Sequence, residues 1–431
     1  MGLKAIAVIE IGTTRTFGVL GALSQAAGAG AAAPAVDILR AADAKSSGIR
    51  KGEVYDVDAA AGAVKKVLGE LGDYPQLKNS ISEVCIVYAG GSLAGDLIVG
   101  KETINNEEGV VFDCDIDTAL QNMTDNRKPD GRRILEQRKI SFILDGAREV
   151  ADPLDMTASQ LTVTGLRTHA DANGARAVEG LVEYCGYNVG GMYSAAYCAP
   201  LGCLTPEQRR LGALVIDLGA GTTSWSVVKN GSVIYAASLP VGGDHITNDL
   251  LCAFRIGSEQ SAQELKHSHS SAVLDGVPVS QRIALPHCIG ISRDVSLKAV
   301  SEVVNARMDE IFQIILGKFE GTRLLSDIGF GAVLCGGGSA LKGADTLAAR
   351  VFGMPCVIGK PAAAGFADLR KPAPDNAKEP PPPALVFGPG HSAALGALSL
   401  AATLQNEALR NEAEKSGWAR LAGKFGFGGR K

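Results

Sequence analysis

The sequence has no long apolar run, no signal-peptide pattern at its first residues and no closely spaced cysteine pair. A membrane-spanning helix needs about 18 consecutive apolar residues, so none is expected here. The nine cysteines are scattered through apolar segments without a CxxC pair, which predicts buried free thiols in a reducing cytoplasm. The six histidines are equally dispersed, and His267-x-His269 has no other metal ligand close by. A zinc-type site is therefore not expected.

What the sequence does contain fits a soluble globular protein. Of its 431 residues, 46% are hydrophobic and 20% are charged, with a net charge of −4. Single hydrophobic cores rarely grow beyond about 250–300 residues. The chain should therefore fold as two or more domains with substantial cores.

The stretch 213–229, ALVIDLGAGTTSWSVVK, is the most informative. Residues 214–216 form an apolar run that predicts a buried strand, and a second strand is expected over 225–228. Between them stand a carboxylate, two glycines and two threonines: Asp217, Gly219, Gly221, Thr222 and Thr223. A carboxylate at a strand end can hold Mg²⁺ through water, and N–H and hydroxyl groups of such a turn can bind phosphate oxygens. An ordinary hairpin with a polar turn is the alternative for this stretch alone.

Two further stretches repeat or complement this pattern. Residues 5–20, AIAVIEIGTTRTFGVL, place Glu10, Gly12, Thr13 and Thr14 in a similar order. Two acidic hairpins in two halves of one chain could close on one polyphosphate from opposite sides. Residues 331–339, GAVLCGGGS, predict a strand that runs into a glycine-rich turn, where missing side chains allow close backbone approach to a ligand.

The three loops together resemble the actin-like ATPase superfamily, and four features narrow the resemblance to the FtsA family of bacterial division proteins. The first loop carries Glu10 where most of the superfamily has aspartate, and 242–249 reads GGDHITND. An insertion of mixed α+β character is expected between the strand at 84–89 and the helix at 171–185. The chain also ends in a short basic amphipathic segment.

The resemblance implies an α/β protein with the two-domain actin-like ATPase fold, an FtsA-type insertion (subdomain 1C) and a C-terminal amphipathic helix. The expected parts are residues 1–91 and 168–207 (lobe 1A), 92–167 (1C), 208–243 and 322–360 (lobe 2A), 244–321 (2B), a Pro-rich loop at 361–384, a closing helix at 385–402, a linker at 403–414 and a membrane-targeting segment at 415–431.

The resemblance also implies ATP and Mg²⁺ as ligands and assigns the site residue by residue. Glu10 and Asp217 would hold Mg²⁺ through its waters, and are the two residues expected to act in catalysis. Gly12, Thr13, Thr14, Gly219, Gly221, Thr222 and Thr223 would hold the phosphates. Gly243, Gln263 and Lys266 would face the ribose. Gly336, Gly337, Gly338, Ser339 and Lys342 would face the adenosine.

Two departures from the family pattern bear on activity. Gln263 stands where the family commonly has a glutamate, beside Lys266. Several enzymes of this fold orient the attacking water with an acid or amide on the segment that corresponds to 193–204, and this stretch has neither. At most a slow ATPase is expected, and not a metabolic enzyme.

The last 17 residues, KSGWARLAGKFGFGGRK, carry five basic residues and no acidic one. Apolar side chains recur at helical spacing on one face, and basic ones flank them, as in helices that lie in a membrane interface. The residues expected to bind the membrane are Trp418, Arg420, Leu421, Lys424, Phe425 and Phe427. A disordered solubilising tail is the alternative, and the three glycines at 417, 423 and 426 favour it, since each weakens a helix by about 1 kcal/mol.

Three classes of function compete. The FtsA resemblance implies a polymer-forming adaptor at the cytoplasmic face of the membrane at the division site. It would bind the FtsZ C-terminal peptide through subdomain 2B, other division proteins through the insertion, further copies of itself and anionic lipid, but no nucleic acid. A pilus-assembly scaffold of the PilM type is the second class. A sugar or acetate kinase is the third, and the sequence shows neither its substrate base nor its larger insertion.

Overall fold

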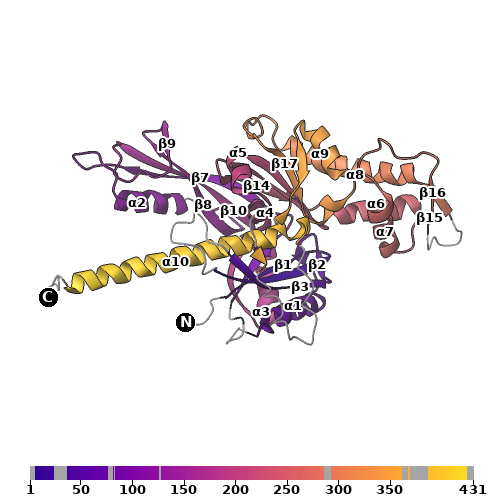
Figure 1. The fold of residues 1–431 in the computed structure, drawn as a ribbon, viewed down its shortest axis with the longest axis horizontal. Coiled ribbons are helices and arrows are strands. Elements are labelled where there is room, and N and C mark those ends of the chain that lie inside the picture. The colour runs from indigo at the N-terminus through magenta and orange to yellow at the C-terminus, as the bar shows by residue number, and fades with distance from the viewer. Residues whose placement is uncertain are drawn as a thin grey trace, which may run out of the picture.

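The computed structural model describes residues 5–23, 36–75, 81, 83–125, 128–285, 293–361, 367–368 and 387–424, with the backbone alone over 410–424. The described chain forms two lobes, an insertion and one long helix (Figure 1). The Ala-rich stretch at 21–35 and the predicted Pro-rich loop at 361–384 lie mostly outside the described residues, as do Phe425 and Phe427.

Lobe 1 is built on a sheet in the order β11-β6-β1-β2-β3-β19. Its strands are β1 (Ala5–Ile11), β2 (Arg15–Leu23), β3 (Val36–Lys45), β6 (Glu83–Tyr88), β11 (Asn188–Ser194) and β19 (Ala367–Asp368). Helices α1 (Val57–Gly72) and α3 (Ala172–Tyr184) belong to this lobe, as does the short hairpin of β4 (Ile49–Arg50) and β5 (Glu53–Val54). β1 is an almost continuous apolar run because both faces of the sheet are covered. Ile9 packs in one core with side chains of α1, and Val8 packs in another with side chains of α4 (Ala195–Cys203) and α10 (Ser392–Lys424).

The insertion is a sheet with one covering helix. Its elements are β7 (Ala94–Thr103), α2 (Asp113–Thr124), β8 (Arg132–Leu144), β9 (Arg148–Val150) and β10 (Gln160–Asp171). It has a separate core around Ile98, Met123 and Leu161. The pair Ala94–Ala237 joins β7 to lobe 2, so that one sheet runs through both in the order β18-β17-β12-β13-β14-β7-β10-β8-β9.

Lobe 2 holds the second acidic hairpin. Its strands are β12 (Ala213–Leu218), β13 (Thr223–Lys229), β14 (Ser232–Leu239), β17 (Gly331–Cys335) and β18 (Cys356–Ile358). Its helices are α6 (Gly243–Phe254), α7 (Glu259–His269), α8 (Leu297–Gly317) and α9 (Ala344–Phe352), with the 3₁₀ turn η1 (Gly337–Ala340) and the hairpin of β15 (Arg282–Leu285) and β16 (Arg293–Ser296). α8 packs its buried face, including Val304, Ile311 and Phe312, into the core of this lobe.

Two helices cross between the lobes. α4 (Ala195–Cys203), which leads into α5 (Pro206–Leu211), packs along the first part of α10 (Ser392–Lys424), which follows the 3₁₀ turn η3 (Pro389–His391). The contact depends on glycine: a Cβ at Gly202 would lie 1.9 Å from the Ser392 carbonyl oxygen, and one at Gly396 1.8 Å from that of Cys198. The two helices therefore pack backbone against backbone.

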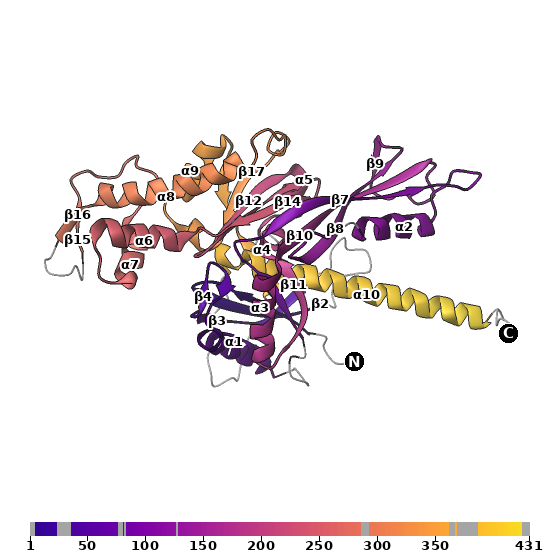
Figure 2. The ribbon, with the colours of Figure 1, turned by 180° about the vertical axis from the view of Figure 1, so that it is seen from behind.

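The structure corrects two expectations. α10 runs without a break through residues 403–414, where a linker is predicted, because nothing in that polar stretch interrupts a helix. Both views show it leaving the junction and extending past the insertion (Figures 1 and 2). The cysteines among the described residues are free thiols, but only Cys198, Cys203 and Cys335 are buried, and Cys114 and Cys252 are exposed. Among the described residues, no helix combines the length and apolar character needed to cross a membrane.

Candidate functional site

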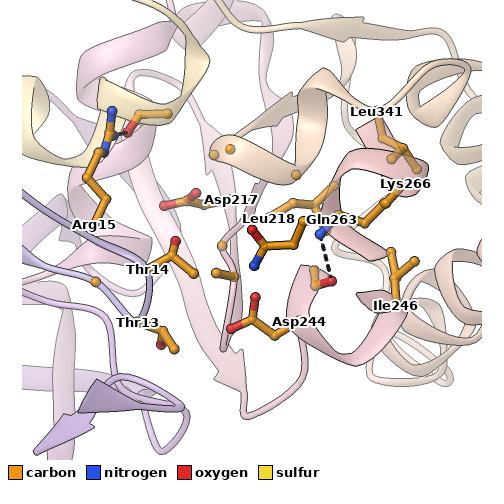
Figure 3. Close-up of a pocket in the computed structure, with 18 of the residues that line it drawn as sticks. Thr13, Thr14, Arg15, Asp217, Leu218, Asp244, Ile246, Gln263, Lys266 and Leu341 are labelled. Carbon is orange, nitrogen blue, oxygen red and sulfur yellow. Dashed lines mark hydrogen bonds between the residues drawn. The ribbon is translucent and has the colours of Figure 1, made fainter. Parts of the chain in front are cut away.

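A cavity of about 430 Å³ lies between the two lobes (Figure 3). Both acidic hairpins, the glycine-rich turn and helices α6, α7 and α8 contribute to its wall. Twelve of the residues predicted from the sequence line it: Glu10, Gly12, Thr13, Thr14, Asp217, Gly219, Gly243, Gln263, Lys266, Gly336, Gly337 and Gly338. The structure therefore brings together stretches that are more than 300 positions apart in the chain.

The two acidic hairpins have the same turn geometry. The Gly12 N–H donates to the Arg15 carbonyl oxygen at 3.0 Å, and the Gly219 N–H donates to that of Thr222 at 2.9 Å. A Cβ at either glycine would lie within 2.8 Å of the same acceptor oxygen, so each turn needs glycine there. The repeat predicted from sequence is confirmed as a structural repeat, but Thr222 corresponds to Arg15 rather than to a threonine of the first loop.

The two carboxylates stand at the ends of β1 and β12. Burial raises the pKa of both side chains, the neighbouring Asp217 carboxylate raises that of Glu10 further, and the nearby Arg15 guanidinium lowers both. Within the described part of the chain, Glu10 Oε2 is buried without a hydrogen-bond partner. Mg²⁺ prefers oxygen ligands and retains some of its waters. Two neighbouring carboxylates, one of them with a buried oxygen that accepts no hydrogen bond, are therefore suitable ligands for it.

The glycine-rich turn lies against the second carboxylate. Gly336 has φ +79°, and a Cβ there would lie 2.3 Å from Asp217 Oδ1. Its N–H donates to the Pro389 carbonyl oxygen at 3.0 Å. By contrast, a Cβ at Gly337 would meet nothing within 4 Å, so the backbone there is open to close approach by a ligand.

Helices α6 and α7 form the opposite wall. Lys266 is buried, and its Nζ donates to Thr247 Oγ1 at 2.8 Å and to the Gly243 carbonyl oxygen at 3.1 Å. Burial lowers the pKa of Lys266, and the neighbouring Asp244 carboxylate raises it in part. The Gln263 side chain points into the cavity, as does that of Asp244 (Figure 3). Lys266 thus ties the start of α6 to α7 and supports the Gly243 backbone from behind.

Five predicted residues do not line this cavity. Thr222 donates its hydroxyl to the Ala89 carbonyl oxygen at 2.9 Å, Thr223 donates to that of Val241 at 2.8 Å, and Ser339 donates to that of Gly336 at 2.7 Å. Gly221 lies against Thr13 and lines a neighbouring cavity instead. The structure places no atom of Lys342 in the cavity wall, although its carbonyl oxygen accepts from the Ala272 N–H at 2.8 Å.

The structure adds lining residues that sequence reasoning missed. Arg15 follows directly after the first loop, so its position in the chain could have indicated it. Asp244 stands within the GGDHITND stretch, which could have indicated it, whereas His391 carries no local signal of this kind. An apolar wall of Ile246, Met308, Ile311 and Leu341 comes from three separate elements and is suited in its chemistry to the flat face of a ligand ring. Among the described residues, no group of three or more His, Cys, Asp or Glu side chains forms a further metal site.

Comparisons with known proteins identify chains that are similar in sequence. The family model described as cell division protein FtsA matches residues 214–395, and that of the SHS2 domain inserted in FtsA matches residues 90–166. The FtsA of Neisseria meningitidis serogroup B is 26% identical over 364 residues, which cover 83% of this chain and 84% of that protein. The FtsA of Agrobacterium fabrum is 27% identical over 363 residues, covering 83% and 81%.

Solved structures show the same fold at lower identity. The PilM–PilN type IV pilus biogenesis complex aligns with a TM-score of 0.58 at 16% identity, covering 92% of this chain and 98% of that one. MreB 5 of Spiroplasma citri bound to AMPPNP aligns with a TM-score of 0.52 at 13% identity, covering 96% and 98%. The described chain has the actin-like ATPase fold with an inserted SHS2 domain. Because two FtsA family models and the FtsA proteins of several bacteria match its sequence, the chain belongs to the FtsA family of cell-division proteins.

Proposed function

We propose that this chain is an ATP-binding, actin-like adaptor that polymerises and tethers the FtsZ ring to the cytoplasmic face of the cell membrane at the division site. The observation that carries the proposal is the cavity between the lobes, where Glu10 and Asp217 meet three glycine-containing turns. It combines two buried carboxylates that could hold a divalent cation, a glycine-rich turn that is open to close approach at Gly337, and an apolar wall. These are the elements that a nucleotide with Mg²⁺ requires.

Each group of residues would contact a different part of the nucleotide. Glu10 and Asp217 would hold Mg²⁺ through water, and the turns at Gly12–Thr14 and Gly219 would bind the phosphates. Gly243, Gln263 and Lys266 would lie along the ribose, and the Gly336–Gly338 turn along the adenosine. Bound Mg²⁺ supplies charge neutralisation for the phosphates. Thr222, Thr223 and Ser339 are assigned a supporting role, because their hydroxyl groups are used inside the protein.

The partner surfaces follow the division into lobes. We assign the FtsZ C-terminal peptide to residues 244–321 and other division proteins to the insertion, residues 92–167. On β7, the exposed fractions of Leu97 and Val99 are 65% and 41%, which is high for apolar side chains and suits a contact surface. The anionic lipid surface is assigned to residues 415–431, at the far end of α10.

A pilus scaffold is the second candidate, since the PilM–PilN complex shares the fold. That likeness, at 16% identity, concerns fold alone. The sequence comparisons favour the division protein: two FtsA family models match, and the curated relatives named above are all FtsA proteins.

Co-sedimentation of the purified chain with anionic liposomes and FtsZ, with and without Mg·ATP, tests the proposal. We expect FtsZ to sediment with liposomes only when the chain is present, and more of it when Mg·ATP is added. Neutral phosphatidylcholine liposomes provide the matched control. Sedimentation of the chain with liposomes but never with FtsZ, in either nucleotide condition, would contradict the proposed adaptor role.

A further inference from the structure

Arg15 links the first acidic hairpin to the segment that precedes α10. Its Nη2 donates to the Gly390 carbonyl oxygen at 2.6 Å, and its Nη1 lies 2.9 Å from Nε2 of His391. All three residues line the cavity between the lobes. The guanidinium group thus bridges the start of β2 and the turn η3, which are more than 370 positions apart in the chain.

The pairing defines the state of the histidine ring. An arginine side chain can only donate hydrogen bonds, so Nε2 of His391 must accept, and the ring must be neutral with its proton on Nδ1. Nδ1 faces the backbone of Gly388, with the carbonyl oxygen 3.1 Å away and the amide nitrogen 3.0 Å away. When Nε2 accepts from Arg15, Nδ1 carries the proton and donates it to the carbonyl oxygen, so the Gly388 N–H is not bonded to the ring. Burial lowers the pKa of His391, as does the Arg15 charge, and the hydrogen bond with the Gly388 backbone and the Asp43 carboxylate oppose this in part. Burial and the contact with Arg15 therefore favour the neutral ring.

The ring is also held by packing. His391 meets the Phe17 ring edge to face, with centroids 4.6 Å apart, and the Phe387 ring at 5.6 Å. The Arg15 guanidinium lies over the same Phe17 ring, 5.4 Å from its centroid. On the other side, the Pro389 carbonyl oxygen accepts from the Gly336 N–H of lobe 2 at 3.0 Å. The segment 387–391 is therefore bonded to the loops of both lobes.

Arg15 is also part of the charge balance of the cavity. Its positive charge lowers the pKa of both Glu10 and Asp217, so the guanidinium group lies within electrostatic reach of the two carboxylates. A guanidinium group has five N–H donors in one plane, and the bonds to Gly390 and His391 need only two of them. The other three are not used by these two bonds, and arginine is well suited to phosphate oxygens.

We infer that His391 is a positioning residue for Arg15, and that Arg15, so held, binds the phosphate chain of the nucleotide. This rests on the proposed function, because it assumes a nucleotide in the cavity. His391 touches no reacting group; it fixes the direction of the guanidinium plane through Nε2, while Gly390 fixes its second edge. Since Gly390 and His391 directly precede α10, phosphate binding and the placement of that helix share one contact, and each affects the other by the same free energy.

The test compares His391→Phe with His391→Gln. Phenylalanine keeps the ring packing on Phe17 and Phe387 but removes the acceptor, whereas glutamine restores an acceptor oxygen. We expect His391→Phe to bind Mg·ATP about ten-fold more weakly than the native chain, the scale of one charge-assisted hydrogen bond, with little change for AMP. His391→Gln should regain most of the affinity. Arg15→Lys, which keeps the charge but loses the planar fork, should behave like His391→Phe and serves if that variant does not fold.

The outcomes separate this inference from the proposed function. If the native chain does not bind Mg·ATP, the proposed function fails. If it binds, and His391→Phe binds Mg·ATP equally well or loses AMP affinity to the same extent, the positioning role is wrong. Hydrogen–deuterium exchange of residues 387–400 gives a second readout: Mg·ATP should slow exchange there in the native chain and not in His391→Phe. Equal protection in both would also overturn the inference.

Discussion

Gly221 and Thr13 touch where the two acidic hairpins meet: a Cβ at Gly221 would lie 2.3 Å from Thr13 Oγ1 and 2.9 Å from the Lys51 Cα. The Thr13 hydroxyl also accepts from the Gly52 N–H at 3.2 Å. The missing side chain at 221 therefore allows the hairpin of lobe 2 to rest on the loops of lobe 1. This contact, and not a phosphate contact, is the first reason for a glycine at that position.

Gly221→Ala should therefore push the two lobes apart at the cavity. We expect a loss of about 1–3 kcal/mol in the free energy of unfolding, as for other overpacked sites, together with weaker Mg·ATP binding. Chemical denaturation and ligand titration measure the two effects. Gly180→Ala in α3 is the control, since a Cβ there meets nothing within 4 Å and should stabilise the helix by up to about 1 kcal/mol. Unchanged stability in Gly221→Ala would show that the lobes do not rest on this contact.

Asp217→Ala should remove most of the Mg²⁺-dependent stabilisation by ATP. A ligand that binds only the native state stabilises it by RT ln(1 + [L]/Kd), which is about 2.7 kcal/mol at 100 times Kd. The measurement is the thermal midpoint with ATP, with and without Mg²⁺. Asp327→Ala is a matched control, because that carboxylate lies on the surface and pairs with Lys229. A full Mg²⁺-dependent shift in Asp217→Ala would place the cation elsewhere.

Glu10→Gln should make the ligand-free protein more stable at pH 8 than the native chain. The pKa of Glu10 is raised in the folded state, so its contribution to stability is present below the unfolded pKa of about 4.5 and is lost as pH rises. Glutamine does not ionise and avoids that loss. The same variant should lose the stabilising effect of Mg²⁺. Thermal midpoints at pH 5 and pH 8 give the comparison. A Glu10→Gln variant that is less stable than the native chain at pH 8 would contradict the conclusion that ionised Glu10 destabilises the folded protein.

Glu136 joins the insertion to lobe 1, because its carboxylate accepts the Ser194 N–H at 3.1 Å where α4 begins. Burial raises the pKa of Glu136 to about 7, against the effects of the nearby Thr168 hydroxyl and of the hydrogen bond from the Ser194 N–H. Its contribution to stability is then lost between the unfolded pKa, about 4.5, and pH 7. The stability of Glu136→Gln relative to native should rise over that window and level off above it. Urea unfolding at several pH values tests this, and a flat difference would refute it.

Glu136→Ala separates the role of the acceptor from that of the charge. Alanine leaves the buried Ser194 N–H without its acceptor, which costs about 1–3 kcal/mol at any pH. Glu136→Ala should therefore be less stable than Glu136→Gln at pH 5 as well as at pH 8. Equal stability of the alanine and glutamine variants would mean that the hydrogen bond across this boundary contributes nothing.

Deletion of residues 415–431 should release the protein from anionic liposomes without changing ATP binding, and Trp418→Glu should do nearly the same. Each basic residue near an anionic surface contributes about 1 kcal/mol, so one tail binds weakly and many tails in a polymer bind together. Flotation with and without Mg·ATP measures this. Trp225→Phe is a control for the loss of a tryptophan, as that side chain is buried in lobe 2. A truncated protein that still floats at moderate salt would exclude the tail as the anchor.

The parts of the candidate site that lie within short stretches could be predicted from the sequence. Glu10 and Asp217 each follow an apolar run and precede a glycine that is spaced for a tight turn, and this signal does not depend on the rest of the chain. The Gly336–Gly338 turn follows its strand in the same way. The local pattern also indicated the insertion, since the residue composition of β7 to β10 differs from that of the strands around them. These features were predictable because strand, turn and glycine preferences act over a few residues.

How those stretches meet, and which of their side chains form hydrogen bonds within the protein, depends on the tertiary structure. Thr222 and Thr223 belong to the predicted motif, yet their hydroxyl groups bond to the Ala89 and Val241 carbonyl oxygens, which no local pattern reveals. Arg15 and His391 are paired only because α10 returns to the junction between the lobes. The physical reason is that buried polar groups must find partners within the fold, and those partners are set by packing across the chain and not by neighbours in sequence.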